Sequence, residues 1–270
     1  MSEAIPTPPP IPSHVERIGE TVIRLGSVDS TNLYLSQLAR QGAPHGLTVI
    51  ADTQPMGRGR MGRSFFSPPG SGLYLSTLLR SPLPPEQLSA LTPWAAVAAV
   101  RAVESVCGLR PDIKWVNDLL LGGKKLGGIL CELDLTTPSS PFVVIGVGIN
   151  VTSHHAFPPE VAAIATALDA HLDAPPHRDA LAEALLVSLD TMWRDFPHKL
   201  PDYLAEYRAG CVTLGQTVTL STPRSRFVGK AVGVDDKFAL VLELPDGRRT
   251  SFSSGEVSLH PIDKPPPEDR

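Results

Sequence analysis

The hydrophobic pattern of this chain predicts a mixed α/β region followed by a small all-β region. Short apolar runs bounded by Gly, Pro or charged residues predict strands at Thr21–Leu25, Leu47–Asp52, Leu73–Leu79, Asp112–Asn117, Lys125–Glu132 and Pro141–Asn150. Stretches of helical length or spacing predict helices at Leu33–Gln41, Glu86–Cys107, Arg178–Asp195 and Leu200–Ala209. We therefore expect an α/β (α+β) fold in which helices flank a mixed sheet.

The hydrophobic pattern changes near residue 211, after which the chain contains only short strand-like runs. One of these runs is broken at Asp235-Asp236, which we interpret as a hairpin tip. We predict that residues 211–262 form a small C-terminal β-barrel and residues 15–210 the main domain. The proline-rich ends, residues 1–14 and 263–270, are predicted to be disordered tails.

Composition and charge narrow the classes of function. The chain has 270 residues, of which 42% are hydrophobic and 19% charged, as expected of a globular protein with a sizeable core. The formal net charge of −4 argues against a general nucleic-acid binder. Three widely separated cysteines, Cys107, Cys131 and Cys211, predict reduced thiols. Because the sequence shows neither a signal peptide nor an apolar run of membrane-spanning length, we expect a cytoplasmic protein.

The segment Gly57–Arg63 reads GRGRMGR and concentrates positive charge in an otherwise mildly acidic chain. No Asp or Glu occurs between Thr53 and Pro85. Arginines that alternate with glycines combine a mobile backbone with planar charged groups that suit carboxylates and phosphates. The loop alone leaves three interpretations open: a site for a small anion, a solvated loop and a nucleic-acid contact.

Two common nucleotide-binding motifs do not account for this loop. Gly57, Gly59 and Gly62 satisfy the pattern G-x-G-x-x-G after a predicted strand. However, no helix can open through Pro68-Pro69-Gly70, and no acidic residue follows about twenty positions later, so we reject a dinucleotide-binding motif. A Walker A loop, G-x-x-x-x-G-K-[ST], occurs nowhere in the chain.

A second group of charged residues surrounds the end of a predicted strand. Lys114–Asp118 offers a cation, an amide and a carboxylate, and Lys124-Lys125 follows within a glycine-rich segment. Neighbouring residues of a strand face opposite ways, so one of these two lysines should face water and the other the sheet surface. Taken alone, such charges are typical of a solvated hairpin. Together with the arginine loop, they favour a negatively charged substrate bound over a sheet.

From about residue 20 to residue 260 the chain resembles the biotin–protein ligases. The resemblance depends on five motifs in the order typical of that family: Ser30-Thr31-Asn32, Gln54 with Gly57–Arg63, Lys114–Asp118, Lys125–Leu130 and Gly146–Asn150. Each motif is weak alone, but five in order are specific. The closing Gly255–Leu259 is similar to the C-terminal module of the family. The related lipoate ligases and octanoyltransferases share the core fold but not the GRGR loop together with K-W-x-N-D.

The resemblance implies a class II synthetase-like core, an SH3-like C-terminal barrel and a reaction in two steps. Biotin and MgATP give biotinyl-5′-AMP and pyrophosphate, and biotin then passes to a lysine of a biotin carboxyl carrier protein. Mg²⁺ is carried by ATP, with no fixed metal site in the protein. Attack of a carboxylate on a phosphate brings like charges together, so this chemistry needs cations aimed at both groups.

The resemblance also implies roles for individual residues. Biotin is expected to contact Ser30, Thr31, Asn32, Gln54, Arg58, Gly59, Arg60, Lys125, Gly127 and Gly128. ATP is expected to contact Arg58, Arg60, Arg63, Phe65, Lys114, Asn117, Lys125 and Asn150. Catalysis is assigned to Lys125, Arg60 and Asp118. Lys125 should touch both the biotin carboxylate and the α-phosphate, and Asp118 should act as an acid–base or orienting group near the incoming lysine.

Several residues depart from the family pattern or lie outside it. Phe65 stands where the family commonly has Trp, and Val116 where it usually has Pro, so we expect weaker stacking and a less rigid strand exit. Trp94 and Trp193 are interpreted as core residues, and His154-His155 as a surface turn.

Three other functions remain as alternatives to a biotin–protein ligase. The rivals are lipoate or octanoate attachment, a nucleic-acid-binding module that uses the arginine loop, and a biotin sensor without activity. Relatives that double as repressors carry an N-terminal helix-turn-helix domain, for which the short proline-rich start leaves too few residues, so we expect no DNA binding. Homodimers are common among relatives, and an exposed sheet edge would be the contact.

Overall fold

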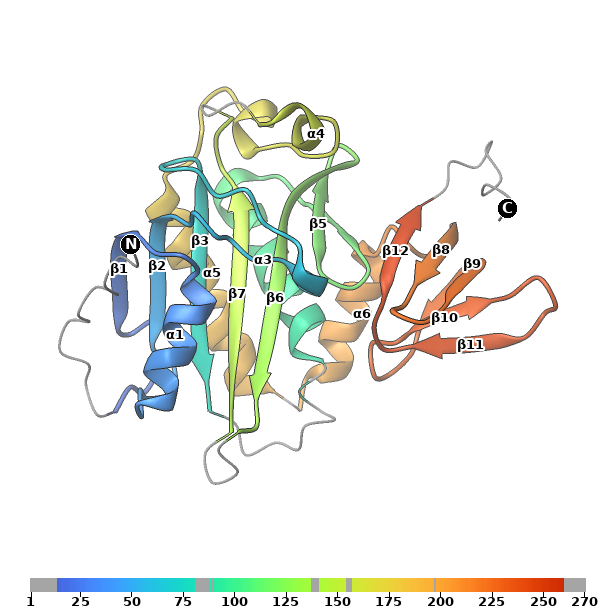
Figure 1. Cartoon of the computed structure of the whole chain (residues 1–270), viewed down its shortest axis with the longest axis horizontal. Helices are drawn as coiled ribbons and strands as arrows, with labels where there is room; N and C mark the ends of the chain where they lie inside the picture. The colour runs from blue at the N-terminus through green and yellow to red at the C-terminus, as the bar shows by residue number, and fades with distance from the viewer. Residues whose placement is uncertain are drawn as a thin grey trace.

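A seven-stranded mixed sheet forms the centre of the protein (Figure 1). The structure is a computed structural model, and it describes residues 14–80, 88, 90–136, 141–153, 157–196 and 198–259. The strand order is β1-β2-β3-β7-β6-β5-β4, in which β1 and β2 run parallel and all other neighbours antiparallel. The strands are β1 (Val22–Ser27), β2 (Thr48–Thr53), β3 (Gly72–Leu79), β4 (Asp112–Lys114), β5 (Asp118–Leu121), β6 (Lys124–Asp134) and β7 (Phe142–Asn150).

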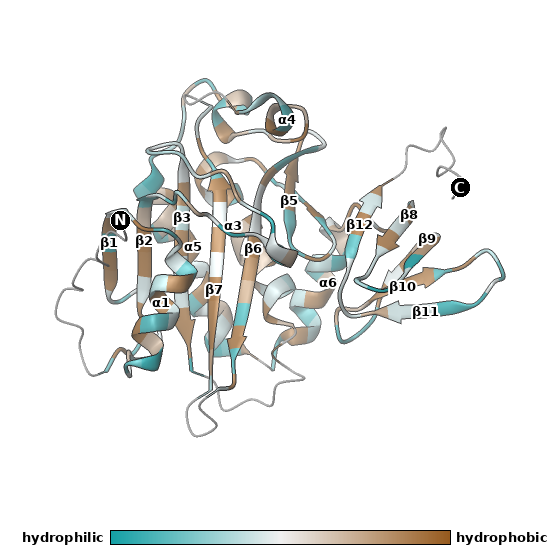
Figure 2. Ribbon diagram, viewed as in Figure 1, coloured by the Kyte–Doolittle hydropathy of each residue, from teal (hydrophilic) through white to brown (hydrophobic). Residues whose placement is uncertain are grey.

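Helices cover both faces of this sheet and leave two separate cores. Helix α1 (Thr31–Arg40) packs on one face, against β2, β3 and β7. The other face carries α3 (Leu91–Cys107), which packs on α5 (Arg178–Asp195) and α6 (Leu200–Gly210). Because successive side chains of a strand point to opposite faces, Leu78 of β3 belongs to the α1 core and Leu75 to the α3 core. The inner strands are apolar along most of their length (Figure 2).

Most of the predicted elements are present with boundaries close to those expected. Helix α3 is capped by Gly108, whose left-handed φ of 65° suits glycine. The turn Gly122-Gly123 joins β5 to β6 with both φ angles positive. The strand predicted at Asp112–Asn117 is shorter than expected, because residues 115–117 form a turn. Strand β4 ends at Lys114, and after a cis peptide between Trp115 and Val116 the chain returns antiparallel as β5.

The C-terminal strands form an open sheet, so the predicted closed barrel is wrong. Five antiparallel strands lie in the order β11-β10-β9-β8-β12, and no pairing joins the edge strands β11 and β12 within the described residues. These edge strands have four residues each, which is short for closing a curved sheet. The strands are β8 (Thr217–Ser221), β9 (Arg226–Val234), β10 (Leu240–Glu243), β11 (Arg249–Phe252) and β12 (Glu256–Leu259).

Short helical segments fill the remaining connections. They are η1 (Arg60–Gly62) in the arginine loop, then α4 (Pro159–Ala162) and η2 (Leu168–His171) after β7. The Asp235-Asp236 segment is the β9–β10 turn, as predicted, since the carboxylate of Asp235 accepts hydrogen bonds from the backbone N–H groups of Lys237 and Ala239.

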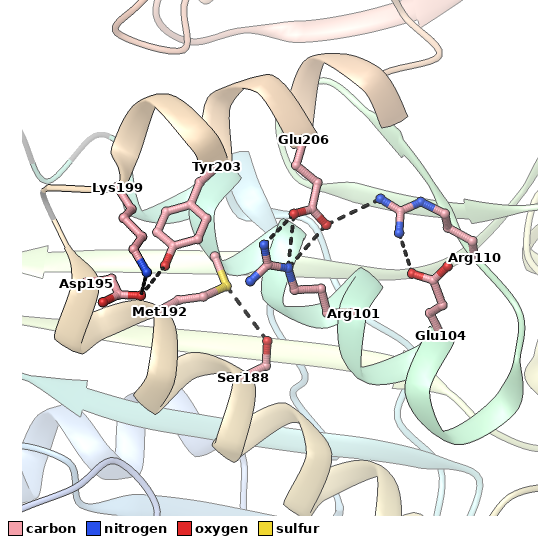
Figure 3. A network of polar contacts seen from close by, with 9 residues as sticks. All are labelled: Arg101, Glu104, Arg110, Ser188, Met192, Asp195, Lys199, Tyr203 and Glu206. Carbon is pink, nitrogen blue, oxygen red and sulfur yellow. Dashed lines mark hydrogen bonds and ion pairs between the residues drawn. The ribbon is translucent and has the colours of Figure 1, made fainter.

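Ion pairs on the helical face tie α3 to α6 (Figure 3). Arg101 Nη2 lies 2.5 Å from Glu206 Oε2, and its guanidinium lies over the ring of Tyr203. Arg110 bridges the same Glu206 to Glu104. Exposed pairs of this kind add little stability singly, but this connected set fixes the helix that leads into the C-terminal sheet.

The structure also settles smaller predictions. Trp94 is fully buried in the core, and Trp193 is partly buried and packs edge-on against it, as predicted for two structural residues. Cys107, Cys131 and Cys211 are free thiols, as predicted. His154-His155 lies outside the described residues. No helix among the described residues is long and apolar enough to cross a membrane.

Candidate active site

One pocket on the α1 side of the sheet brings together nearly all of the predicted site residues. Its walls come from the start of α1, the arginine loop, strands β4 to β7 and the beginning of β12. The predicted residues that line it are Ser30, Thr31, Asn32, Gln54, Arg58, Gly59, Arg60, Arg63, Phe65, Lys114, Asn117, Asp118, Lys125 and Gly128. Segments from the start of α1 to the beginning of β12 therefore meet at one site.

One end of the pocket is neutral and polar. Ser30, Thr31 and Asn32 at the start of α1 are buried, as is Gln54 after β2. Gln54 Oε1 accepts hydrogen bonds from the backbone N–H of Thr31 at 2.8 Å and from its hydroxyl at 3.0 Å. These bonds fix the amide of Gln54 and leave this end of the pocket with hydrogen-bonding groups but no net charge.

The arginine loop folds back on itself over the other end. The N–H of Gly59 donates to the carbonyl of Arg63 at 2.7 Å, and Arg58 and Ser64 form an isolated antiparallel bridge. Arg60 Nη1 donates to Asn117 Oδ1 at 3.0 Å, and burial lowers the pKa of the Arg60 guanidinium. A buried cation that stays charged interacts strongly with an anion, because few water molecules screen it.

Carboxylates from two different strands pair with two arginines of the loop. Arg58 Nη1 lies 3.1 Å from Glu132 Oε1 on β6, and Arg63 pairs with Glu256 on β12. Glu256 brings the C-terminal sheet into the pocket wall. The hydrogen bond from Arg63 lowers the pKa of Glu256.

The two lysines of the β5–β6 hairpin take different positions, as predicted. Lys124 is exposed and its Nζ donates to the carbonyl of Ala162 at 3.3 Å. Lys125 lines the pocket, where its Nζ lies 2.6 Å from Asp118 Oδ1. Lys114 stands opposite Asp118 in the β4–β5 pairing, and burial lowers the pKa of the Lys114 ammonium. A cluster of cations thus lies beside a neutral polar subsite, which suits a ligand with an uncharged head and an anionic end.

Comparison with known proteins agrees with this arrangement. Residues 25–150 match the biotin/lipoate A/B protein ligase family, and residues 213–260 match the biotin protein ligase C-terminal domain. The bifunctional ligase/repressor BirA of Bacillus subtilis is 34% identical over 88% of this chain and 74% of its own length. The chain belongs to the biotin protein ligase family.

Other members of the family support this assignment. The biotin–[acetyl-CoA-carboxylase] ligase of Mycobacterium tuberculosis is 35% identical to this ligase over 84% of the chain and 85% of its own length. The solved structure of biotin protein ligase from Aquifex aeolicus in complex with biotin and ATP superposes with a TM-score of 0.77 at 28% identity. That match covers 89% of this ligase and 99% of the Aquifex chain.

Two residues predicted to contact ligand do not line the pocket of this ligase. Gly127 faces the neighbouring strand, and a Cβ atom there would lie 2.3 Å from the carbonyl oxygen of Gly148. Asn150 is buried, and its Nδ2 donates to the carbonyl of Thr166 at 3.0 Å. Gly127 thus allows close strand packing, and Asn150 fixes the connection after β7.

Sequence reasoning missed several residues that shape the pocket. Glu132 and Glu256 look like ordinary surface carboxylates in the sequence, and only the fold brings them to the arginines. Gly146 and Gly148 belong to one of the family motifs, but the motif alone does not show what packs against them. A Cβ atom on Gly146 would lie 2.2 Å from Asn32 Oδ1, and one on Gly148 would lie 2.8 Å from the Phe65 ring. The spacing of two glycines on one face of a strand was the signal that something packs there.

Proposed function

We propose that this chain is a biotin–[biotin carboxyl carrier protein] ligase. The observation that carries the proposal is the single pocket in which a neutral polar subsite, Thr31 with Gln54, adjoins the cations Arg58, Arg60 and Lys125. Biotin has an uncharged bicyclic head and a carboxylate tail, so it matches this division. ATP brings the second anionic group that the same cations attract.

In the first step the biotin carboxylate attacks the α-phosphorus of ATP. A bond forms between the carboxylate oxygen and phosphorus, the bond from that phosphorus to the bridging oxygen of pyrophosphate breaks, and biotinyl-5′-AMP remains. Both reactants are anions, so Lys125 and Arg60 are assigned to hold them together and to stabilise the charge that develops on the phosphoryl oxygens. Arg58, Arg63, Lys114 and Asn117 are assigned to bind the nucleotide, and Phe65 to pack against it.

In the second step the ε-amino group of a carrier lysine attacks the acyl carbon of the adenylate. The amide bond forms, AMP leaves with the bonding electrons, and the amine loses a proton. Asp118 is assigned to receive or orient that proton, because it is the carboxylate that contacts Lys125 in the pocket. The arginine loop excludes water from the mixed anhydride.

Mg²⁺ is expected to enter with ATP. The described residues contain no cluster of three or more His, Cys, Asp or Glu side chains. A magnesium ion bound mainly by phosphates and water fits such a site, with Asp118 and Asn117 as nearby oxygen donors. Bound there, Mg²⁺ would neutralise phosphate charge.

The remaining expectations are part of the same proposal. Two of the three arginines of the loop, Arg58 and Arg63, pair with carboxylates of the same chain, and Arg60 donates to Asn117, which supports an active-site role over a nucleic-acid-binding role. We further propose a carrier protein as the partner, no operator DNA, a cytoplasmic location suited to free thiols, and domains at 15–210 and 211–262. A homodimer would use an edge strand of the large sheet, β1 or β4.

Transfer to a carrier tests this proposal. The purified chain is incubated with biotin, MgATP and an isolated biotin carboxyl carrier domain, and the carrier is followed by intact mass spectrometry. We expect the carrier to gain the mass of one biotinyl group, and a carrier with Arg in place of its acceptor lysine to gain none. Lipoyl or octanoyl transfer in parallel reactions, without biotinyl transfer, would assign the chain to the related ligases.

A further inference from the structure

Ser76 is a fully buried hydroxyl directly beneath the neutral end of the pocket. It lies on β3 opposite Gly146 of β7, and its side chain does not line the pocket. Its Oγ lies 2.7 Å from Thr31 Oγ1 and 2.6 Å from Asn32 Oδ1. The absence of a side chain at Gly146 allows this approach, since a Cβ there would collide with Asn32 Oδ1.

The hydrogen bonds around Ser76 fix which atom of each amide is the oxygen. The backbone N–H of Thr31 donates to Gln54, so the atom it meets must be Oε1. Asn32 Nδ2 donates to the carbonyl of Leu130 at 3.1 Å and to Glu132 Oε2 at 2.9 Å. Asn32 therefore turns Oδ1 toward Ser76, and Ser76 is its hydrogen-bond donor among the residues that the structure describes.

The hydroxyl and amide protons of this network determine which pocket groups donate hydrogen bonds to a ligand and which accept them. The hydroxyl proton of Thr31 goes to Gln54 Oε1, so Thr31 Oγ1 has only lone pairs to offer a ligand. Ser76 has one proton for two acceptors, Thr31 Oγ1 and Asn32 Oδ1, so this buried network lacks one donor. Among the described residues, Gln54 Nε2 makes only a long bond, 3.4 Å to Ser67 Oγ, and can donate to a ligand. The neutral end therefore presents an acceptor, Thr31 Oγ1, beside a donor, Gln54 Nε2.

We infer that Ser76 is a positioning residue that sets ligand specificity through Thr31. By holding Thr31 Oγ1 from below, it keeps the lone pairs of that oxygen turned to the pocket, which then selects a ligand group with an N–H donor beside a carbonyl acceptor. This inference rests on the proposed function, because the ureido ring of biotin carries that pair of groups. A bound N–H supplies the missing donor to Thr31 and releases the proton of Ser76 to Asn32.

The test uses Ser76→Ala in the full chain, with biotin-dependent ATP–pyrophosphate exchange as the assay. We expect the KM for biotin to rise about tenfold, equivalent to about 1.4 kcal/mol, while the KM for ATP and kcat stay within about twofold. A matched control is Thr77→Val. Thr77 is equally buried on the opposite face of β3, where it bonds to Thr48 Oγ1 at 3.1 Å. Thr77→Val removes a similar hydrogen bond and should leave the KM for biotin unchanged.

A second readout separates polarity from packing. The substrates are two biotin analogues, each with one of the two ureido N–H groups replaced by oxygen. For one of these analogues, the kcat/KM of the wild type should be at least tenfold lower than for biotin. In Ser76→Ala this penalty should shrink several-fold, because the hydroxyl of Thr31 is then free to turn its proton to the pocket. If Ser76→Ala does not fold, Ser76→Cys keeps the volume with a weaker donor and should give an intermediate penalty.

Each outcome decides a different claim. A wild type without biotin-dependent exchange would refute the proposed function, whatever the variants do. An active wild type with an unchanged KM for biotin in Ser76→Ala would refute the role of Ser76. Equal effects of Ser76→Ala and Thr77→Val on biotin, or an unchanged analogue penalty, would show that Ser76 is only a packing residue.

Discussion

Lys125 Nζ and Asp118 Oδ1 lie 2.6 Å apart across the β5–β6 pair, and both residues line the pocket. The lysine assigned to bind both substrate anions is thus paired with a carboxylate of the protein itself. Arg58 with Glu132 and Arg63 with Glu256 repeat this relationship. Such pairs keep flexible cations in position, and we expect a substrate anion to take the place of a protein carboxylate when it binds.

The Lys125–Asp118 pair predicts that Asp118 matters more for transfer than for adenylation. In Asp118→Asn the amide keeps the shape of the side chain but cannot accept a proton from the incoming amine. We expect biotinyl transfer to a carrier to fall at least 100-fold, the usual scale of general base catalysis, while pyrophosphate exchange falls less than tenfold. Single-turnover transfer from preformed adenylate measures the second step directly. Equal losses in both steps would assign Asp118 to positioning Lys125 instead.

The Arg63–Glu256 pair predicts that the C-terminal sheet holds the arginine loop in place. In Glu256→Gln the loop loses its partner on β12, so we expect proteolysis within residues 57–63 to speed up several-fold without ligand. Biotin with MgATP should slow this cleavage in wild type and variant. Glu243→Gln is the matched control, since it removes an ion pair with Arg249 in the same sheet but away from the pocket. The same cleavage rate in all three proteins would contradict the link.

Acidification should break the Arg63–Glu256 pair. The pKa of Glu256 is lowered from its ordinary value of 4.5, first by the hydrogen bond from Arg63. A carboxylate with a lowered folded-state pKa stabilises the fold fully above its ordinary pKa and loses that effect as the pH falls through the lowered value. We therefore expect loop cleavage by an acid-active protease to rise below about pH 4.5 in the wild type. Glu256→Gln should be cleaved quickly at every pH, and a wild-type rate that does not change with pH would count against the role of Glu256.

Alanine substitutions at Gly146 and Gly148 should raise the KM for different substrates. Gly146→Ala would displace Asn32, so we expect mainly a higher KM for biotin. Gly148→Ala would displace the Phe65 ring, so we expect mainly a higher KM for ATP. Each increase should be about tenfold if the displaced side chain loses its contact with substrate. Gly26→Ala on β1 is the control, because a Cβ there meets no atom within 4 Å. Similar effects of both substitutions on both substrates would argue against two separate subsites.

Local sequence features predicted the parts of this site that have strong local chemistry. The arginine loop, Lys114–Asp118 and Lys125 are unusual in charge or glycine content, and all line the pocket. Strand alternation predicted that Lys124 and Lys125 take opposite positions, and the family resemblance assigned Lys125 to the site. These features depend on neighbouring residues in the chain, which sequence reasoning can use.

Features that depend on packing across the fold were not predictable in this way. Ser76, Glu132 and Glu256 act through partners more than 40 residues away, and none has an unusual local sequence. The prediction of a closed barrel was wrong for the same reason, because strand lengths and turn signals do not show whether two edge strands pair. Gly127 and Gly128 look alike in the sequence, yet only Gly128 lines the pocket.

The central claim is that this pocket activates biotin as an adenylate with Lys125 as a key cation. The most direct measurement is ATP–pyrophosphate exchange with biotin, lipoate or octanoate as the only added acid. It is made on the wild type, Lys125→Ala and the matched control Lys124→Ala, whose side chain is exposed outside the pocket. We predict exchange with biotin alone, a loss of at least 100-fold in Lys125→Ala, and nearly wild-type exchange in Lys124→Ala. The account would be contradicted if none of the three acids supported exchange, or if Lys125→Ala exchanged as fast as the wild type.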